Sequence, residues 1–290
     1  MLTGAALAGA GVAAAAVGIE EGVLPGRSWL YRHFGPQGTP GVVPSVTPGR
    51  SLSGSFVSQA RLGKSCGWTI GFPPGQGPDL PVVVVLHGRG FDHTSAFDPE
   101  SLGLDRFLAA TVQQGARPFA LASVDGGDTY WHARESGEDA GRMVLSEFLP
   151  LLAEHGLDVR RVGFLGWSMG GYGALSLAGR LGPDRVAGVA AMSPALWHDF
   201  DDTAPGAFDD AEDFAAATVF GREAQLDGIA VRIDCGEGDP FYAATRDYAE
   251  ALDHPPSGGF EPGNHDLGYW RRMAPAELRF LARSFSAQPA

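Results

Sequence analysis

Residues 162–175 read Val162-Gly163-Phe164-Leu165-Gly166-Trp167-Ser168-Met169-Gly170-Gly171-Tyr172-Gly173-Ala174-Leu175. An apolar run of strand character leads into a G-x-S-x-G core, and small residues then recur at helical spacing. This is the pattern of a strand, a sharp turn and a helix, in which the turn lifts the hydroxyl of the central serine above the end of a sheet. The same core also occurs in turns that only pack, so a catalytic role for Ser168 requires an acid and a base later in the chain.

Strand-like runs on both sides of this stretch alternate with helical segments. We expect further strands at 53–58, 66–72, 82–86, 119–124, 186–192 and 229–235, and helices at 102–114, 139–155, 242–252 and 276–285. The first two strands are expected to form an antiparallel hairpin, and 82–86 is expected to be a central strand because it is β-branched almost throughout. The alternation predicts the α/β class, a mostly parallel sheet with helices on both faces, whose chemistry lies at the carboxyl ends of the strands.

The chain divides into three parts. Residues 1–19 are uncharged and rich in Ala and Gly, which predicts an export signal whose basic start would lie upstream, since Arg27 is the first basic residue. A membrane anchor or a disordered tail is the alternative, and the protein is cytoplasmic if this segment is not a functional signal. Residues 20–51 are expected to be a linker or a peripheral wrap. Residues 52–290 form the predicted catalytic domain, with an acidic, aromatic partial lid at about 195–228.

Composition excludes several classes of protein. The formal net charge is −13 over 290 residues, without a cluster of Lys or Arg, which argues against nucleic acid and anionic membranes as partners. The acidic lid lacks the pattern of a calcium loop, and two cysteines cannot build a cysteine-rich zinc site, so we expect no metal. We expect Cys66 and Cys235 to be free, buried thiols, because they belong to strands near opposite edges of the sheet.

A base and an acid follow the serine in the order that this chemistry requires. His265 is the preferred base because it lies in a late loop just before the last helix, whereas His254 lies in a proline-rich turn. Asp239 is the preferred acid because it follows a strand and precedes a proline that opens the next helix. Glu237 and Asp234 are competitors, and Asp239 could instead only cap that helix.

Acyl transfer also needs two fixed donors for the developing oxyanion. The backbone N–H of Met169, the residue after the serine, is expected to be one of them. The turn after residues 82–86 is expected to supply the other, from Arg89 or alternatively from Gly90. Residues expected to form the walls of the site and bind substrate are His87, Gly88, Gly90, Trp131, His132, Trp167 and Trp197.

Four segments together resemble the α/β-hydrolase superfamily: residues 82–90, 166–173, 238–241 and 263–266. Within it, the pattern is similar to the esterase D-like esterases, the branch that also holds S-formylglutathione hydrolases and secreted mycolyltransferases. The resemblance covers about residues 52–285. It implies hydrolysis of a carboxylic ester through an acyl-serine, with Ser168, Asp239 and His265 as the triad, no cofactor, and a small-molecule or lipid acyl ester as substrate.

Two alternatives to an esterase remain open at this point. An acyltransferase of the mycolyltransferase type would use the same chemistry on a different acceptor. A non-catalytic relative that binds the cell wall or carbohydrate would keep only the fold, and the complete set of serine, acid and histidine argues against it. Neither the natural substrate nor the oligomeric state follows from the sequence.

Overall fold

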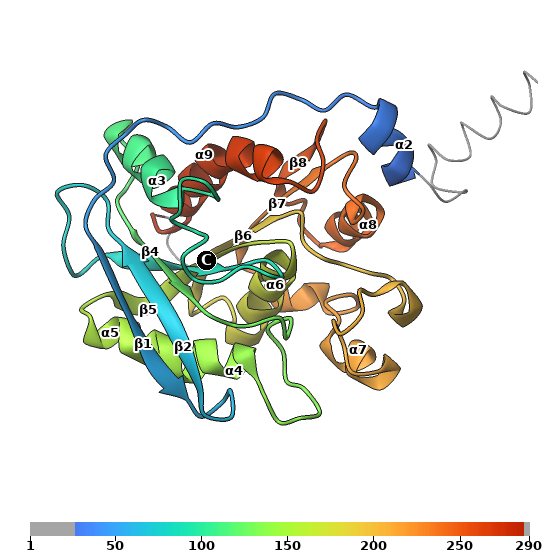
Figure 1. Ribbon diagram of the computed structural model, residues 1–290, viewed down its shortest axis with the longest axis horizontal. Helices are drawn as coiled ribbons and strands as arrows, with labels where there is room; N and C mark the ends of the chain where they lie inside the picture. Colours follow the sequence, from blue (N-terminus) through green and yellow to red (C-terminus); the bar gives the residue numbers. More distant parts are fainter. Residues whose placement is uncertain (1–26, 287–290) are drawn as a thin grey trace, which may run out of the picture.

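The computed structural model describes residues 27–286, so the predicted export signal at 1–19 lies outside the described residues. An eight-stranded sheet runs through the molecule in the order β1-β2-β4-β3-β5-β6-β7-β8 (Figure 1). Its strands are β1 (Ser51–Ser58), β2 (Lys64–Gly71), β3 (Pro81–Leu86), β4 (Ala120–Val124), β5 (Asp158–Trp167), β6 (Val186–Met192), β7 (Ala230–Gly236) and β8 (Ser257–Glu261). The hairpin of β1 and β2 joins β4 in antiparallel register, and the other neighbouring pairs are parallel.

Helices cover both faces of the sheet. They are α2 (Arg27–Phe34), α3 (Leu104–Gln113), α4 (Ala140–Met143), α5 (Leu149–Glu154), α6 (Met169–Leu181), α7 (Ala211–Ala217), α8 (Tyr242–Ala251) and α9 (Leu267–Ser284). One turn of π-helix, Val144–Phe148, joins α4 to α5. Within residues 27–286, no helix combines the length and the apolar character needed to cross a bilayer.

The central strand β3 is apolar throughout because it is buried on both faces of the sheet. Val83 and Val85 pack into one hydrophobic cluster with residues of α3 and α9, while Val82 and Val84 pack into another with residues of α4, α5 and α6. All four side chains are completely buried. The predicted mostly parallel sheet with helices on both faces is therefore confirmed.

Three elements differ from the sequence-based expectation. Helix α2 lies in the segment expected to be a linker, and β8 was not predicted, because a strand that reads Ser-Gly-Gly-Phe-Glu has little β-propensity and is held by pairing with β7. Helix α9 begins at Leu267 rather than near residue 276. The cause is Asp266, whose side chain accepts a hydrogen bond from the Tyr269 N–H and starts the helix before Pro275.

The insertion at 195–228 packs beside α6. Its aromatic side chains point inward, as predicted: Phe208 is buried, and Phe214 and Phe220 pack against the same core. The Tyr172 hydroxyl of α6 donates a 2.6 Å hydrogen bond to the Ala217 carbonyl at the end of α7. The insertion therefore lies against the body of the domain rather than apart from it.

Buried polar side chains join β7 to α9. Arg232 donates two hydrogen bonds, of 2.6 and 2.9 Å, to the carboxylate of Asp234. Glu277 of α9 is completely buried, with its Oε2 3.7 Å from the Arg232 Nε. Burial and the neighbouring Asp234 carboxylate raise the pKa of Glu277 well above its usual range, which favours the protonated form of its carboxyl group.

Both cysteines are free and buried, as predicted. Cys66 lies in β2 and Cys235 in β7, and four strands separate these two in the sheet. Five steps of about 4.8 Å between neighbouring strands exceed the reach of a disulfide.

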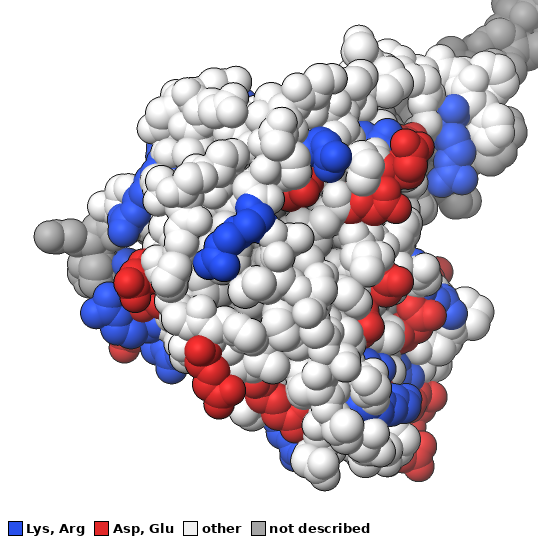
Figure 2. All heavy atoms as spheres, turned by 60° about the vertical axis from the view of Figure 1, so that its left-hand side comes forward, with Lys and Arg blue, Asp and Glu red and all other residues white. Residues whose placement is uncertain are grey.

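On the face seen in Figure 2, the basic side chains are scattered among acidic and uncharged ones and form no continuous patch.

Candidate active site

Ser168 sits at the junction of β5 and α6. Its backbone has φ 56° and ψ −123°, a left-handed conformation that non-glycine residues rarely adopt. Two glycines make the tight turn possible, because a Cβ at Gly166 would collide with the Gly170 carbonyl, and one at Gly170 would collide with the Leu86 carbonyl of β3. The predicted strand, sharp turn and helix are confirmed, and strain at this point holds the hydroxyl at the end of the sheet.

The structure brings Ser168, His265 and Asp239 together. The Nε2 atom of His265 lies 2.9 Å from the Ser168 Oγ, and its Nδ1 lies 2.8 Å from the Asp239 Oδ2. A carboxylate only accepts hydrogen bonds, so the His265 Nδ1–H donates to Asp239 and Nε2 is left to accept from the serine hydroxyl. This is the arrangement in which a histidine can remove a proton from a serine.

The surroundings hold the acid and the histidine firmly. Asp239 is completely buried, and its Oδ1 accepts a 2.9 Å hydrogen bond from the Phe241 N–H. The ring of His265 packs edge-on against two aromatic rings, Phe241 at 5.1 Å and Trp270 at 5.0 Å between centroids. Neither aromatic was predicted from the sequence, although Phe241 comes only two residues after the predicted acid.

The competing residues lie elsewhere. The side chain of His254 is 91% exposed and lies beside Asp253. Asp234 is engaged by Arg232 in the buried cluster between β7 and α9, and Glu237 is only half-buried. None of the three is in hydrogen-bonding contact with Ser168 or His265 among the described residues.

The two backbone N–H groups expected to stabilise the oxyanion, those of Met169 and Arg89, have no hydrogen-bonding partner within residues 27–286. Met169 is the first residue of α6, where an N–H has no acceptor within the helix. Arg89 lies in the turn after β3, next to Gly88, where a Cβ would lie 3.4 Å from the Cβ of Ser168. The alternative donor, the Gly90 N–H, is already bonded to the Asp128 Oδ1 at 2.7 Å.

His87 is buried behind the turn that follows β3 and does not form a wall of the site. It is completely buried, and its Nε2 accepts a 3.0 Å hydrogen bond from the Gly126 N–H. Its Nδ1 therefore carries the proton and donates at 2.8 Å to the Gly88 carbonyl. Burial lowers the pKa of His87, so the ring stays neutral and links the turn to the loop after β4.

Three other expected wall residues also lie away from the open surface. Trp167 and Trp131 are buried, and the Trp131 indole fills the space between Gly126 and Gly173, where any Cβ would clash with it. His132 is 5% exposed, and its Nε2 lies 3.1 Å from the Asp213 Oδ2 of α7. These side chains support the loops of the site from within the core.

Trp197 does lie close to the triad. It is partly exposed, and its ring packs edge-on against Phe241 at 5.2 Å, which in turn contacts His265. Tyr130, which the sequence analysis also missed, packs against the other side of Trp197 at 5.7 Å. Tyr130, Trp197 and Phe241 thus form a row of three aromatic side chains that ends at His265.

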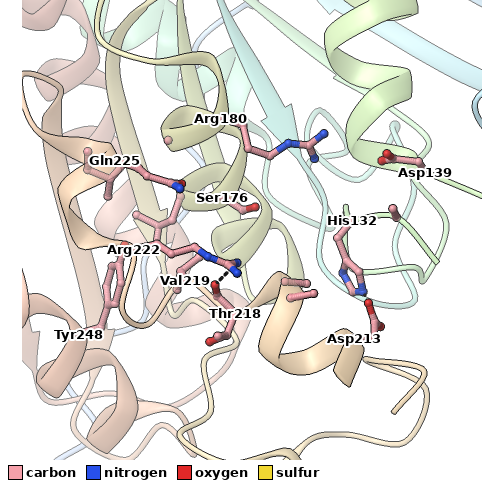
Figure 3. A pocket seen from close by; sticks show the side chains of 16 residues that line it. His132, Asp139, Ser176, Arg180, Asp213, Thr218, Val219, Arg222, Gln225 and Tyr248 are labelled. Carbon is pink, nitrogen blue, oxygen red and sulfur yellow. Dashed lines mark hydrogen bonds and ion pairs between the residues drawn. The ribbon is translucent and has the colours of Figure 1, made fainter. Parts of the chain in front are cut away.

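A groove of about 290 Å³ lies between α6 and the insertion, lined by Ser176, Arg180, Arg222 and Gln225 among others (Figure 3). None of the triad residues lines it, and Arg222 already donates to two backbone carbonyls of α7 and the loop that follows. Ser168, Asp239 and His265 lie at a different place, near the ends of β5 and β7.

Among residues 27–286, no group of three or more His, Cys, Asp or Glu side chains is placed to bind a metal ion.

Comparisons with known proteins identify the family of this chain. A model of the family described as "Putative esterase" matches residues 60–281, more than half of the chain. No protein among the curated sequences matches it. Similar solved structures include a ferulic acid esterase, with a TM-score of 0.69, 21% identity, and coverage of 83% of this chain and 100% of that chain.

Two further structures share the fold. An S-formylglutathione hydrolase from Agrobacterium tumefaciens has a TM-score of 0.67 at 18% identity, over 83% of this chain and 97% of that chain. The fluorophosphonate-binding serine hydrolase FphF from Staphylococcus aureus has a TM-score of 0.62 at 19% identity, over 81% of this chain and 99% of that chain. The predicted α/β-hydrolase fold is confirmed.

Proposed function

We propose that this chain, which belongs to the esterase family of the α/β-hydrolases and is a carboxylic ester hydrolase, cleaves its substrate through an acyl-enzyme on Ser168. The observation that carries the proposal is the unbroken hydrogen-bonded row from the Ser168 Oγ through His265 to the buried Asp239, with distances of 2.9 and 2.8 Å. A serine hydroxyl is a weak nucleophile unless a base takes its proton as it attacks.

In the proposed first step, His265 Nε2 takes the proton from the Ser168 Oγ as that oxygen attacks the ester carbonyl. The imidazolium that forms is stabilised by the carboxylate of Asp239. The negative charge on the carbonyl oxygen is stabilised by the N–H groups of Met169 and Arg89. Collapse of the intermediate breaks the ester C–O bond, and His265 passes its proton to the departing alcohol.

In the proposed second step, water repeats the attack on the acyl-serine. His265 takes a proton from the water, the acyl–Oγ bond breaks, and the proton returns to the Ser168 oxygen. The acid product leaves and the free enzyme is restored. Small-molecule esters are the substrates this chemistry requires, and no cofactor takes part in the proposed steps.

The test compares three variants on 4-nitrophenyl esters of short and long acyl chains. Ser168→Ala should fold normally and lose several orders of magnitude in kcat. Asp239→Asn should lose about 10⁴-fold, because the amide favours the wrong histidine tautomer. Glu237→Gln, two residues away on the same loop, is the matched control and should keep near-normal turnover.

Other outcomes would contradict specific parts of the proposal. Wild-type turnover in a folded Ser168→Ala protein would refute the acyl-serine mechanism. If Glu237→Gln lost more activity than Asp239→Asn, the acid would be Glu237. Faster product formation with added alcohol than with water alone would favour the acyltransferase alternative.

Export is a separate proposal, which the uncharged Ala- and Gly-rich sequence of residues 1–19 supports. We expect the full-length gene product to be processed and found outside the cytoplasm. Cell fractionation with N-terminal sequencing checks this. Recovery of the uncleaved chain in the cytoplasm alone would contradict it.

A further inference from the structure

Arg89 places a cation without an ion-pair partner beside the reactive serine. It follows Gly88, where a Cβ would lie 3.4 Å from the Cβ of Ser168, and its own side chain is exposed. Its guanidinium hydrogen-bonds to the Tyr130 hydroxyl, and it belongs to none of the ion pairs within residues 27–286. The acid of the neighbouring loop, Asp128, uses its Oδ1 to accept from the Gly90 N–H.

An aromatic row connects this cation to the histidine of the site. Burial raises the pKa of Tyr130, and the adjacent Arg89 guanidinium opposes that effect, so the positive charge lies beside the Tyr130 hydroxyl. The Tyr130 ring packs against Trp197, Trp197 packs against Phe241, and Phe241 packs against His265. Arg89 and His265 therefore lie at opposite ends of the row.

In the proposed mechanism, the alcohol part and the acyl part of the ester lie on opposite sides of Ser168. His265 protonates the departing alcohol, so the alcohol lies on the histidine side, and the carbonyl oxygen faces the N–H groups of Met169 and Arg89. The acyl group then extends away from His265. Arg89 lies at the end of the aromatic row that is farther from His265, so we place the acyl group on the Arg89 side.

We infer that this enzyme prefers esters whose acyl group carries a negative charge, with the guanidinium of Arg89 as the group that recognises the anion. The inference rests on the proposed function, because it names the substrate class of the same site. An apolar or aromatic acyl body would lie against the partly exposed Trp197, and a carboxylate at its far end would accept charge-assisted hydrogen bonds from Arg89.

The test uses two esters of the same shape that differ in one charge, 4-nitrophenyl 4-carboxybenzoate and 4-nitrophenyl 4-carbamoylbenzoate. The para carboxylate cannot reach its own ester, so self-hydrolysis does not interfere. The readout is the ratio of kcat/KM for the charged ester to that for the neutral ester. In the wild-type protein we expect a ratio of about ten, on the scale of one hydrogen bond to a charged group.

Two variants isolate the contribution of Arg89. Arg89→Gln should reduce the ratio to one or below, whatever its absolute rates, and Arg89→Lys should keep part of the preference. Arg279→Gln makes the same change in net charge on the exposed side of α9, about 18 Å along that helix from Leu267, and should leave the ratio at its wild-type value. Added salt should lower the wild-type ratio because the arginine is exposed.

The outcomes separate this inference from the proposed function. If the neutral ester is hydrolysed in a Ser168-dependent manner but the wild-type ratio is one or below, the preference for an anion is refuted. The same holds if Arg89→Gln keeps the wild-type ratio, or if Arg279→Gln lowers it equally. If Ser168→Ala hydrolyses the neutral ester as fast as wild type, the proposed function itself fails.

Discussion

Replacing Glu277 by glutamine should make the protein more stable at neutral pH and remove part of its pH dependence. The glutamate is completely buried, and its polar neighbours are the Asp234 carboxylate and the Arg232 guanidinium. Burial first, and then the Asp234 carboxylate, raise its pKa well above the usual range. Glutamine has the same shape and carries no charge at any pH, so Glu277→Gln removes only the titration.

The difference between the pKa of Glu277 in the folded protein and in the unfolded chain decides how the free energy of unfolding changes with pH. In the unfolded chain Glu277 loses its proton at about pH 4.3, whereas in the folded protein it keeps that proton to a higher pH. Between these two pKa values the folded state binds one more proton than the unfolded state, so the free energy of unfolding falls as pH rises. One such group changes it by up to about 1.4 kcal/mol per pH unit. Above the folded pKa the loss is complete and constant.

The assay is urea denaturation of both proteins at half-unit steps from pH 4 to pH 8, followed by tryptophan fluorescence. The two free energies should be similar at pH 4, and the advantage of the variant should grow with pH from about 4.3 upward. Glu250→Gln is the matched control, since the Glu250 side chain is 72% exposed and loses the same charge. Parallel pH curves for wild type and Glu277→Gln would refute the reasoning, as would a variant less stable at every pH.

Two further predictions concern packing and thiols. Gly173→Ala should destabilise the fold by about 1–3 kcal/mol, because its Cβ would collide with the Trp131 indole, whereas Gly77→Ala, with no atom within 4 Å, should change stability by less than about 0.5 kcal/mol. Equal thermal midpoints for these two variants would contradict the packing described for Trp131. Titration of the denatured, unreduced protein with a thiol reagent should find two reactive groups per chain, since Cys66 and Cys235 are free. A result of zero would mean that the two sulfurs are bonded to each other and that the strand order is wrong.

The meeting of Ser168, His265 and Asp239 could be predicted from the sequence because each of them lies in a short, local pattern. Ser168 lies between two glycines that only a sharp turn needs, and Asp239 and His265 each lie in a loop that precedes a helix. Backbone conformation is decided locally at such places, so the sequence around each residue is sufficient. The order of serine, acid and histidine along the chain then limits the choice to a few candidates.

What could not be predicted depends on contacts between distant segments. Burial of His87 and Trp131 depends on the loop after β4, which folds back under the turn after β3, and nothing within either segment indicates this. The same holds for Tyr130 and Trp270, whose places beside the site are fixed by partners far away in the sequence. Strand β8 is held by its pairing with β7, and its own residues have little β-propensity, so the strand could not be predicted from its sequence.

The strand order has a consequence for how the protein is made. From β5 onward the sheet grows outward in chain order, through β6 and β7 to the edge strand β8, and the serine precedes the histidine by 97 residues. His265 follows β8 and directly precedes α9, so it is synthesised after every strand of the sheet. Under the proposed mechanism, a chain that ends before this edge carries Ser168 without the base that takes its proton.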